Sequence, residues 1–368
     1  MTPRPARLRR LLPLLALALA LTGCSAMLER EYQSVTPHDR LSVAEDDSNA
    51  VWVETYSELQ SAILAQVKAH QEVGIIRLRN WQADVEDALT RACDEVSHDD
   101  PLGAYAVDRI QHAFTRMVTY YEATVTIDYR RTAEQIAAVT TVTGSGAIRA
   151  ELVDALGAFL TETAFQVNYF DASLDAAYIQ SLVREAYYDL PTAALGMPEV
   201  QVNLYPDSGS RRVVEVFFTY PEDPEVLSAK RVRLEEAVLD LADTQAQGDD
   251  LPGALFQALR SQVQTAEEGS TAYAALVEGA ADSQGMALAY KALCDQAGVE
   301  CQVVEGTLDG APHFWTIVAW GNGNRHVDPS WGEGLLLDDA QMAAAGYLWD
   351  TAAYPVCGEA AAEEAQEG

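Results

Sequence analysis

The chain has 368 residues, of which 49% are hydrophobic and 22% are charged, which is enough apolar material for two or three packed domains. It carries 24 basic and 56 acidic residues, a formal net charge of −32. This charge excludes a nucleic-acid partner, whose phosphates would repel the protein. It also disfavours binding to an anionic membrane through a basic patch. Five cysteines are too few for a scaffold built from disulfides.

The first segment has the features of an export signal. Four arginines precede an apolar stretch, residues 11–21, that is too short to span a bilayer as a stable anchor. The stretch ends in Leu21-Thr22-Gly23-Cys24, which resembles the lipobox of bacterial lipoproteins. This resemblance implies that residues 1–23 are a signal peptide and that a lipid on Cys24 holds the exported protein to the outer face of the bacterial cell membrane. Removing the signal takes away four arginines and no acid, so the mature chain would carry a net charge of −36.

The order of predicted elements repeats along the mature chain. Residues 24–50 are polar and predict a tether. After it come a strand at 51–53, a helix from Ser57, a strand at 74–78, a helix to about Val96 and a strand at 121–129. A similar order recurs about ninety residues later, with strands at 165–169, 200–204 and 213–220. We therefore predict two similar α/β modules, 51–143 and 144–247, which is consistent with a duplication. The second module includes a charged helix at about 228–245.

The last part, residues 248–358, is predicted to be a separate α+β domain, followed by a disordered acidic tail at 359–368. Apolar residues recur at helical spacing after Ser283 and stop at Gly298. Strands are predicted at 301–305 and 313–320. A strong hairpin signal, Gly321-Asn322-Gly323-Asn324, then connects to a strand at 325–329.

The hairpin constrains where its polar side chains lie. The turn can be centred on Gly321-Asn322 or on Asn322-Gly323. Both choices leave His313 and Asp328 on the same face of the hairpin. The first choice sets Asp328 opposite Trp315 and makes His313 its diagonal neighbour, about 7–8 Å away at Cα. Ser283 precedes a helix, where backbone N–H groups favour an anion. A nucleophile, a base and an orienting carboxylate are the three parts of an acyl-transfer site.

Three segments in this order resemble the transglutaminase-like core, a family of the papain-like superfamily. The family patterns are Cys-x-Gly-(Tyr/Phe)-Ala, Gly-x-Pro-His-x-Trp and His-Val-Asp-Pro-x-Trp. In this chain they read Ser283-Gln284-Gly285-Met286-Ala287, Gly310-Ala311-Pro312-His313-Phe314-Trp315 and His326-Val327-Asp328-Pro329-Ser330-Trp331. The resemblance spans residues 271–332. It implies a papain-like α+β fold with Ser283, His313 and Asp328 at the triad positions and Trp315 and Trp331 in the core or lining the cleft.

The chain departs from the family pattern at the nucleophile, because Ser283 stands where the family has cysteine. A serine hydroxyl is a poor nucleophile unless a base is placed strictly beside it. The leading hypothesis is therefore a degenerate, non-catalytic domain, a pseudoenzyme that binds a peptide or protein segment at the cell envelope. The alternative is a Ser-His-Asp hydrolase or acyltransferase acting on peptide or amide bonds. A third reading is that the motifs are misaligned. An assembled site would place Ser283 within about 4–5 Å of His313.

Metal and cofactor motifs are absent from the sequence. It contains neither His-Glu-x-x-His nor Cys-x-x-Cys, so we predict no zinc site and no cofactor. The sequence leaves open whether Cys294 forms a disulfide with Cys301 and whether Cys93 forms one with Cys357.

Overall fold

The computed structural model describes residues 50–170, 175–243 and 250–358. The predicted signal peptide, Cys24, the tether except its last residue and the tail at 359–368 lie outside the described residues. The described residues from Val51 onward belong to one compact unit. Among them, no helix has the length and apolar character needed to cross a membrane.

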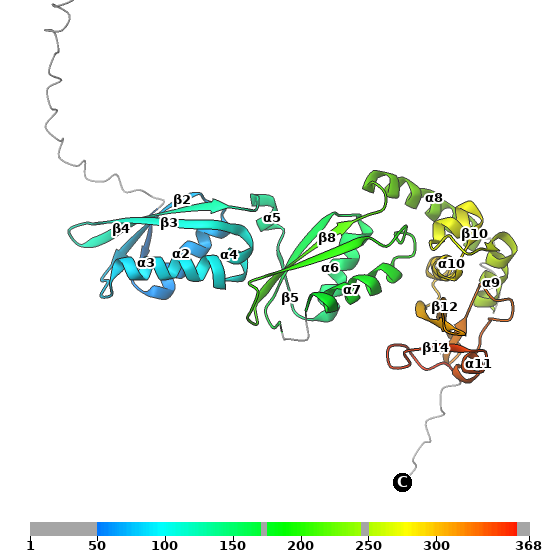
Figure 1. Ribbon diagram of the computed structural model, residues 1–368. Helices are drawn as coiled ribbons and strands as arrows, with labels where there is room; N and C mark the ends of the chain where they lie inside the picture. Colours follow the sequence, from blue (N-terminus) through cyan, green and yellow to red (C-terminus); the bar gives the residue numbers. More distant parts are fainter. Residues whose placement is uncertain (1–49, 171–174, 244–249, 359–368) are drawn as a thin grey trace, which may run out of the picture. The chain divides into compact units, whose positions relative to one another are not determined.

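The first module is a mixed four-stranded sheet with helices packed on one face (Figure 1). Its strand order is β1 (Val51–Val53), β2 (Val73–Arg79), β4 (Tyr120–Tyr129), β3 (Val107–Arg116), with β1 parallel to β2 and the other pairs antiparallel. The helices are α2 (Tyr56–Lys68), α3 (Val85–Asp94), the π-helical turn η1 (Glu95–Asp99) and α4 (Pro101–Ala106). Thr55 and Glu58 begin α2 with a capping box. Leu59 and Ile63 of α2 are fully buried in the same core as Leu78 of β2.

The second module repeats this plan. Its sheet has the order β5 (Thr140–Val142), β6 (Glu162–Val167), β8 (Arg212–Thr219), β7 (Glu199–Tyr205). Again the first pair is parallel and the others are antiparallel. The accompanying helices are α5 (Ala133–Ala137), α6 (Ser145–Gly157), α7 (Ala176–Asp189) and α8 (Pro224–Asp243). The prediction of two similar α/β modules is thus confirmed, and the second sheet takes its first strand from residues before 144.

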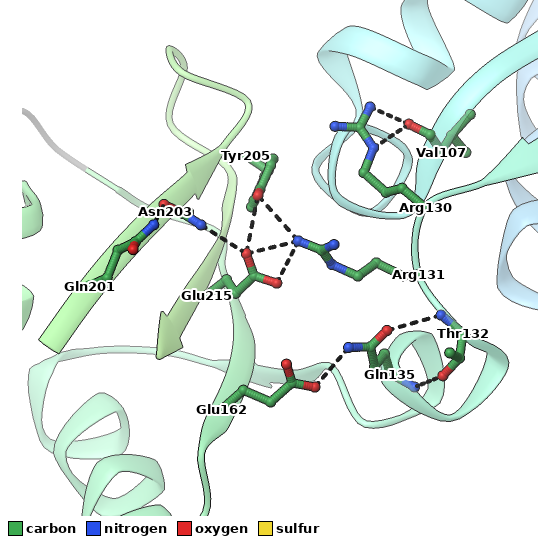
Figure 2. Close-up of polar contacts among 10 residues, drawn as sticks. All are labelled: Val107, Arg130, Arg131, Thr132, Gln135, Glu162, Gln201, Asn203, Tyr205 and Glu215. Atoms are coloured by element: carbon green, nitrogen blue, oxygen red, sulfur yellow. Dashed lines mark hydrogen bonds and ion pairs between the residues drawn. The ribbon is translucent and has the colours of Figure 1, made fainter. Parts of the chain in front are cut away.

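A buried ion pair joins the two modules (Figure 2). Glu215 of β8 is 2% exposed, and its carboxylate lies 2.7 Å from the guanidinium of Arg131, which follows β4. The Tyr205 hydroxyl and the Asn203 amide each donate to the same carboxylate at 3.1 Å. Val213 of β8 is buried in the core cluster of the first module. Charge, hydrogen bonds and apolar packing therefore hold the first module against the second.

The third module is built on an antiparallel sheet with the order β13 (Gly323–Val327), β12 (Ala311–Trp320), β11 (Cys301–Leu308), β14 (Tyr347–Trp349). Around it lie α9 (Leu251–Gln262), α10 (Ser283–Gln296), α11 (Asp339–Ala344), the π-helical turn η2 (Ala274–Glu278) and the short parallel pair β9 (Gln264–Thr265) and β10 (Ala280–Ala281). From Gly285 to Cys294, every residue of α10 is buried. The predicted α+β fold class is confirmed for the chain as a whole.

The ion pair between the modules predicts a large effect of removing one partner. Arg131→Met would leave the Glu215 carboxylate buried and unpaired, so we expect a loss of about 3 kcal/mol in the free energy of unfolding. Arg131→Met combined with Glu215→Leu should recover much of that loss, because it removes the uncompensated charge. Urea denaturation followed by tryptophan fluorescence measures both.

A matched control is the exposed pair Arg109–Asp128, whose side chains are 62% and 47% exposed. Arg109→Met should change the unfolding free energy by less than about 1 kcal/mol. Equal losses for Arg131→Met and Arg109→Met would show that the buried pair does not join the modules.

Candidate active site

The β12–β13 hairpin sets the geometry of the candidate site. Trp320 pairs with Gly323, so the turn is Gly321-Asn322, the first of the two predicted registers. Gly321 has φ 59°, which is the backbone conformation that a tight hairpin turn demands and that glycine adopts without strain. Thr316 pairs with Val327. Continuing this register by one residue sets Asp328 opposite Trp315 and makes His313 its diagonal neighbour, as the sequence predicts.

His313 and Asp328 form a short hydrogen-bonded pair. The imidazole Nε2 lies 2.6 Å from Asp328 Oδ2, and the Asp328 side chain is fully buried whereas that of His313 is 15% exposed. An ionised carboxylate only accepts hydrogen bonds, so Nε2 carries the proton and Nδ1 of the neutral ring is unprotonated. His313 is therefore oriented as a general base would be, with Nδ1 as its basic atom.

Further donors surround the buried carboxylate. The Tyr347 hydroxyl donates to Oδ2 at 2.6 Å. Ser330 donates to Oδ1 through its backbone N–H at 2.8 Å and its hydroxyl at 2.6 Å. Burial raises the pKa of Asp328, but the hydrogen bond and charge of His313 and the bonds from Ser330 and Tyr347 outweigh it and hold the pKa below its ordinary value. The carboxylate stays ionised despite its burial.

Ser283 is the first residue of α10, and its hydroxyl is bonded to the strand that carries His313. Ser283 Oγ accepts a hydrogen bond from the backbone N–H of Phe314 at 3.2 Å. The preceding Asp282 caps the helix by accepting from the N–H of Gly285 at 2.9 Å. Within the described ranges, no hydrogen bond joins Ser283 to His313. The structure thus brings Ser283 to the backbone of the residue that follows His313, without a hydrogen bond from its hydroxyl to the imidazole.

The close packing around Gly285 explains why the first motif has a glycine at this position. A Cβ at this position would lie 2.1 Å from the carbonyl oxygen of Gly269 and 2.8 Å from the Ala281 side chain. The start of α10 therefore approaches the preceding loop too closely for any other residue. Gln284 ties the same loop down by donating to the carbonyl of Ser270 at 3.1 Å.

The two tryptophans of the motifs differ in exposure. Trp315 is fully buried, with its ring centroid 5.2 Å from that of Tyr347 and 5.9 Å from that of Trp349. Trp315 is therefore a core residue, the first of the two positions that the resemblance left open for it. Trp331 is half-buried and lies 6.2 Å from Tyr347. It keeps a surface that a ligand can contact.

A second histidine lies behind Trp315. The Trp315 indole donates to Nδ1 of His326 at 2.9 Å, and Nε2 of His326 lies 2.8 Å from Asp339 Oδ1. Because an indole N–H only donates, Nδ1 must be the acceptor and Nε2 must carry the proton. Burial lowers the pKa of His326, and the neighbouring Asp339 carboxylate opposes this only in part. His326 is held as a neutral ring with one tautomer.

The ligand atoms of His326, Asp339 and Cys357 lie within 4.8 Å of one another, a spacing that suits a metal ion. The donor set does not fit one, because both ring nitrogens of His326 are already committed. A metal ion could bind Nε2 only if that nitrogen gave up its proton. The ring would then become an imidazolate, or the proton would move to Nδ1 and break the hydrogen bond from Trp315. Burial, with the charge of Asp339, raises the pKa of the Cys357 thiol to about 12, which disfavours the thiolate that metals bind. We interpret the cluster as a hydrogen-bonded part of the core.

Cys93, Cys294, Cys301 and Cys357, the cysteines that the structure describes, are free thiols. Neither of the two disulfides that the sequence left open is formed. Cys294 and Cys357 are buried, and none of the four lies at the start of α10. No described thiol therefore takes the place of the missing nucleophile.

Sequence reasoning missed the residues that β14 contributes. Tyr347 bonds Asp328, and the Trp349 ring lies 4.9 Å from that of His326. β14 pairs with β11 and not with a neighbour in sequence. The two aromatic residues of Tyr347-Leu348-Trp349 were the available signal, since aromatic residues favour strands.

Comparison with known proteins gives only distant similarity. No protein-family model matches the sequence, and no curated protein matches it. One solved structure, a TGase, shares 15% identity over 47% of this chain and 52% of that chain, with a TM-score of 0.25. The chain thus spans about half the length of that relative. A putative protease from Parabacteroides distasonis shares 9% identity over 78% of this chain and 69% of that chain, with a TM-score of 0.22. These scores carry no argument about function, so the site is interpreted from its own geometry.

The depressed pKa of Asp328 predicts a pH dependence. The ionised Asp328 side chain stabilises the fold at pH values above its unfolded-state pKa of about 3.9. This stabilisation is lost as the pH falls through the lower pKa that the group has in the folded protein. Asp328→Asn should cost about 3 kcal/mol of unfolding free energy near neutral pH. This difference from the wild type should shrink below about pH 4. Urea denaturation at several pH values measures it.

The exposed acid Glu333 provides the control for this measurement. Glu333→Gln should change the unfolding free energy by less than about 0.5 kcal/mol at every pH. A cost of Asp328→Asn that does not change between neutral and acidic pH would contradict the assignment of an ionised, stabilising Asp328.

Both ring nitrogens of His326 are occupied by hydrogen bonds, so we predict that the cluster of His326, Asp339 and Cys357 does not bind a transition metal. Excess Zn²⁺ should leave the melting temperature unchanged, and Co²⁺ should produce no thiolate charge-transfer absorption. A rise in melting temperature that Cys357→Ser abolishes would contradict the hydrogen-bonded assignment.

Proposed function

We propose that the third module, residues 248–358, is a non-catalytic domain with a transglutaminase-like plan that binds a peptide or protein segment. A serine nucleophile must pass its proton to the base as it attacks. The observation that carries the proposal is that no hydrogen bond joins the Ser283 hydroxyl to His313 within the described residues. The bond from the Phe314 N–H uses only a lone pair of Ser283 Oγ, so it fixes the oxygen without directing the hydroxyl proton to the base. The base is assembled, but the group that it would activate is not connected to it.

The surroundings suit a peptide ligand. Phe314, whose backbone N–H bonds Ser283, and Tyr188 are half-buried aromatic residues whose ring centroids lie 5.8 Å apart. Alternation along β12 places the Phe314 ring on the opposite face of the strand from His313. Tyr188 belongs to α7 of the second module, so that module contributes to the surface near the site. Half-buried aromatic rings beside polar groups are typical of surfaces that bind protein segments. Trp331 adds a third such ring beside Tyr347.

A specific observation also favours a second candidate, a Ser-His-Asp hydrolase or acyltransferase. The His313–Asp328 pair is intact, and its geometry commits Nε2 to the carboxylate, so Nδ1 is the basic atom of the neutral ring. Donation of the Ser283 O–H to this nitrogen would assemble a triad, and the bond from the Phe314 N–H could remain, because that bond uses a lone pair of the same oxygen. The two candidates therefore differ in whether the bond from Ser283 to His313 forms.

We further propose that a lipid on Cys24 attaches the protein to the outer face of the cell membrane. Support comes from the sequence alone, namely the arginine-rich start, the short apolar stretch and the Leu21-Thr22-Gly23-Cys24 motif. A diacylated or triacylated cysteine binds a bilayer far more firmly than a single acyl chain does. The binding domain would then act at the cell envelope.

Labelling with active-site probes tests the non-catalytic proposal. A fluorophosphonate should leave the wild type unlabelled. Ser283→Cys should react with iodoacetamide at least about tenfold faster than Ser270→Cys, because a thiol at a helix start beside a histidine is readily ionised. Ser270 is the matched control, since it is exposed and bonded to Asp282 in the same loop region.

Adding His313→Ala to Ser283→Cys should slow the reaction to the rate of the control. Fluorophosphonate labelling of the wild type that Ser283→Ala abolishes would overturn the non-catalytic proposal and establish the second candidate. Equal reactivity of the two cysteine variants would show that position 283 has lost the character of the site altogether.

A further inference from the structure

One end of the first sheet carries apolar side chains that are open to solvent. The exposed residues are Trp52 on β1, Phe114 on β3 and Val118 between β3 and β4. With the partly buried Tyr120 and Tyr121 of β4 they are here called the hairpin patch. Val118 at the tip is fully exposed, Trp52 is 44% exposed and Phe114 is 37% exposed. Exposed apolar groups that cluster in this way mark contact surfaces.

The patch has apolar groups on both faces of the sheet. Tyr120 pairs with Arg79 and Trp52 with Arg77, which places the two aromatic rings on the face without helices, 5.0 Å apart. Phe114 and Tyr121 alternate to the face that carries the helices, with centroids 6.1 Å apart. Tyr121 packs against the core there, and Phe114 remains exposed. A surface for docking one protein domain would be apolar on a single face. A hairpin that is apolar on both faces and at its tip suits insertion into a medium that surrounds it.

Arginines flank the aromatic rings. The Arg116 guanidinium lies 5.8 Å from the Tyr121 ring centroid, and that of Arg79 lies 5.8 Å from the Trp52 ring. Tryptophan and tyrosine are enriched where a membrane meets water, and arginine side chains extend from apolar surroundings to lipid phosphates. The residue types of the patch are therefore those of a membrane interface.

The patch also lies near the point where the described chain begins. Trp52 follows Cys24 by 28 residues, a segment that can span at most about 100 Å when extended. A lipid on Cys24 would hold the first module within this distance of the bilayer and raise the effective concentration of its surface there. From these observations we infer that the hairpin patch inserts into the headgroup region of the membrane that carries the anchor. This inference rests on the proposed lipidation of Cys24.

The contact should depend on apolar insertion more than on charge. The mature chain would carry a net charge of −36, which anionic lipids repel over a distance set by ionic strength. Salt screens this repulsion, so added salt should strengthen the contact. A basic patch would show the opposite dependence.

Site-specific fluorescence on the full chain tests the inference. An environment-sensitive dye is attached at Thr119→Cys beside the tip or, as the control, at Val356→Cys, which is 77% exposed in the third module. Both variants carry Cys301→Ser, because Cys301 is a partly exposed thiol among the described cysteines. Each is reconstituted into vesicles of phosphatidylethanolamine and phosphatidylglycerol that contain nitroxide-labelled lipid. Flotation in a density gradient reports membrane attachment separately.

The dye at position 119 should lose fluorescence through quenching by the nitroxide lipid, more strongly at higher salt, and the dye at 356 should not. Adding Val118→Asp should abolish the quenching at 119 without changing the melting temperature, because this side chain has no packing to lose. Flotation without quenching at 119 would overturn the hairpin contact and leave the anchor standing, as expected if the patch binds a protein instead. Failure to float would overturn the anchor. Equal quenching at both positions would contradict a specific role of the hairpin.

Discussion

The third module depends on one buried carboxylate. Asp328 is fully enclosed, yet its oxygens receive hydrogen bonds from His313, Tyr347 and both the backbone and the hydroxyl of Ser330. A buried charge is tolerated only when its partners satisfy it in this way. These donors come from β12, β14 and the turn after β13, so the need to satisfy Asp328 fixes how the strands and the turn meet. The orientation of His313 follows from the same constraint.

The central part of the site was predictable because its geometry is local. The turn Gly321-Asn322 fixes the register of β12 and β13, and the register alone sets His313 diagonal to Asp328. The helix after Ser283 was likewise visible in its apolar spacing. Tyr347 was not predictable, because β14 reaches Asp328 through pairing with β11. The burial of Trp315 also depends on this pairing, since Tyr347 and Trp349 pack against its ring.

The same distinction applies to the two repeated modules. The longer helices of both were visible because apolar residues recur along them at helical spacing. The inner strands β2 and β8 were visible as short runs of apolar residues, which are buried in the structure. β3 was missed, since most of its residues are exposed and it therefore shows no apolar pattern. Its counterpart β7 was predicted from Val200, Val202 and Leu204, which pack against the core. Recognition of the repeat could have supplied β3, because β7 and β3 hold the same place in the two strand orders.

The account holds that His313 is a prepared base to which Ser283 is not coupled. The most direct test is the ¹⁵N NMR titration of His313 in the wild type and in Ser283→Ala. If the Ser283 hydroxyl makes no hydrogen bond to His313, the substitution should leave the Nδ1 chemical shift and the titration midpoint of His313 unchanged. A shift of either one would show a hydrogen bond between Ser283 and His313 and would contradict the account.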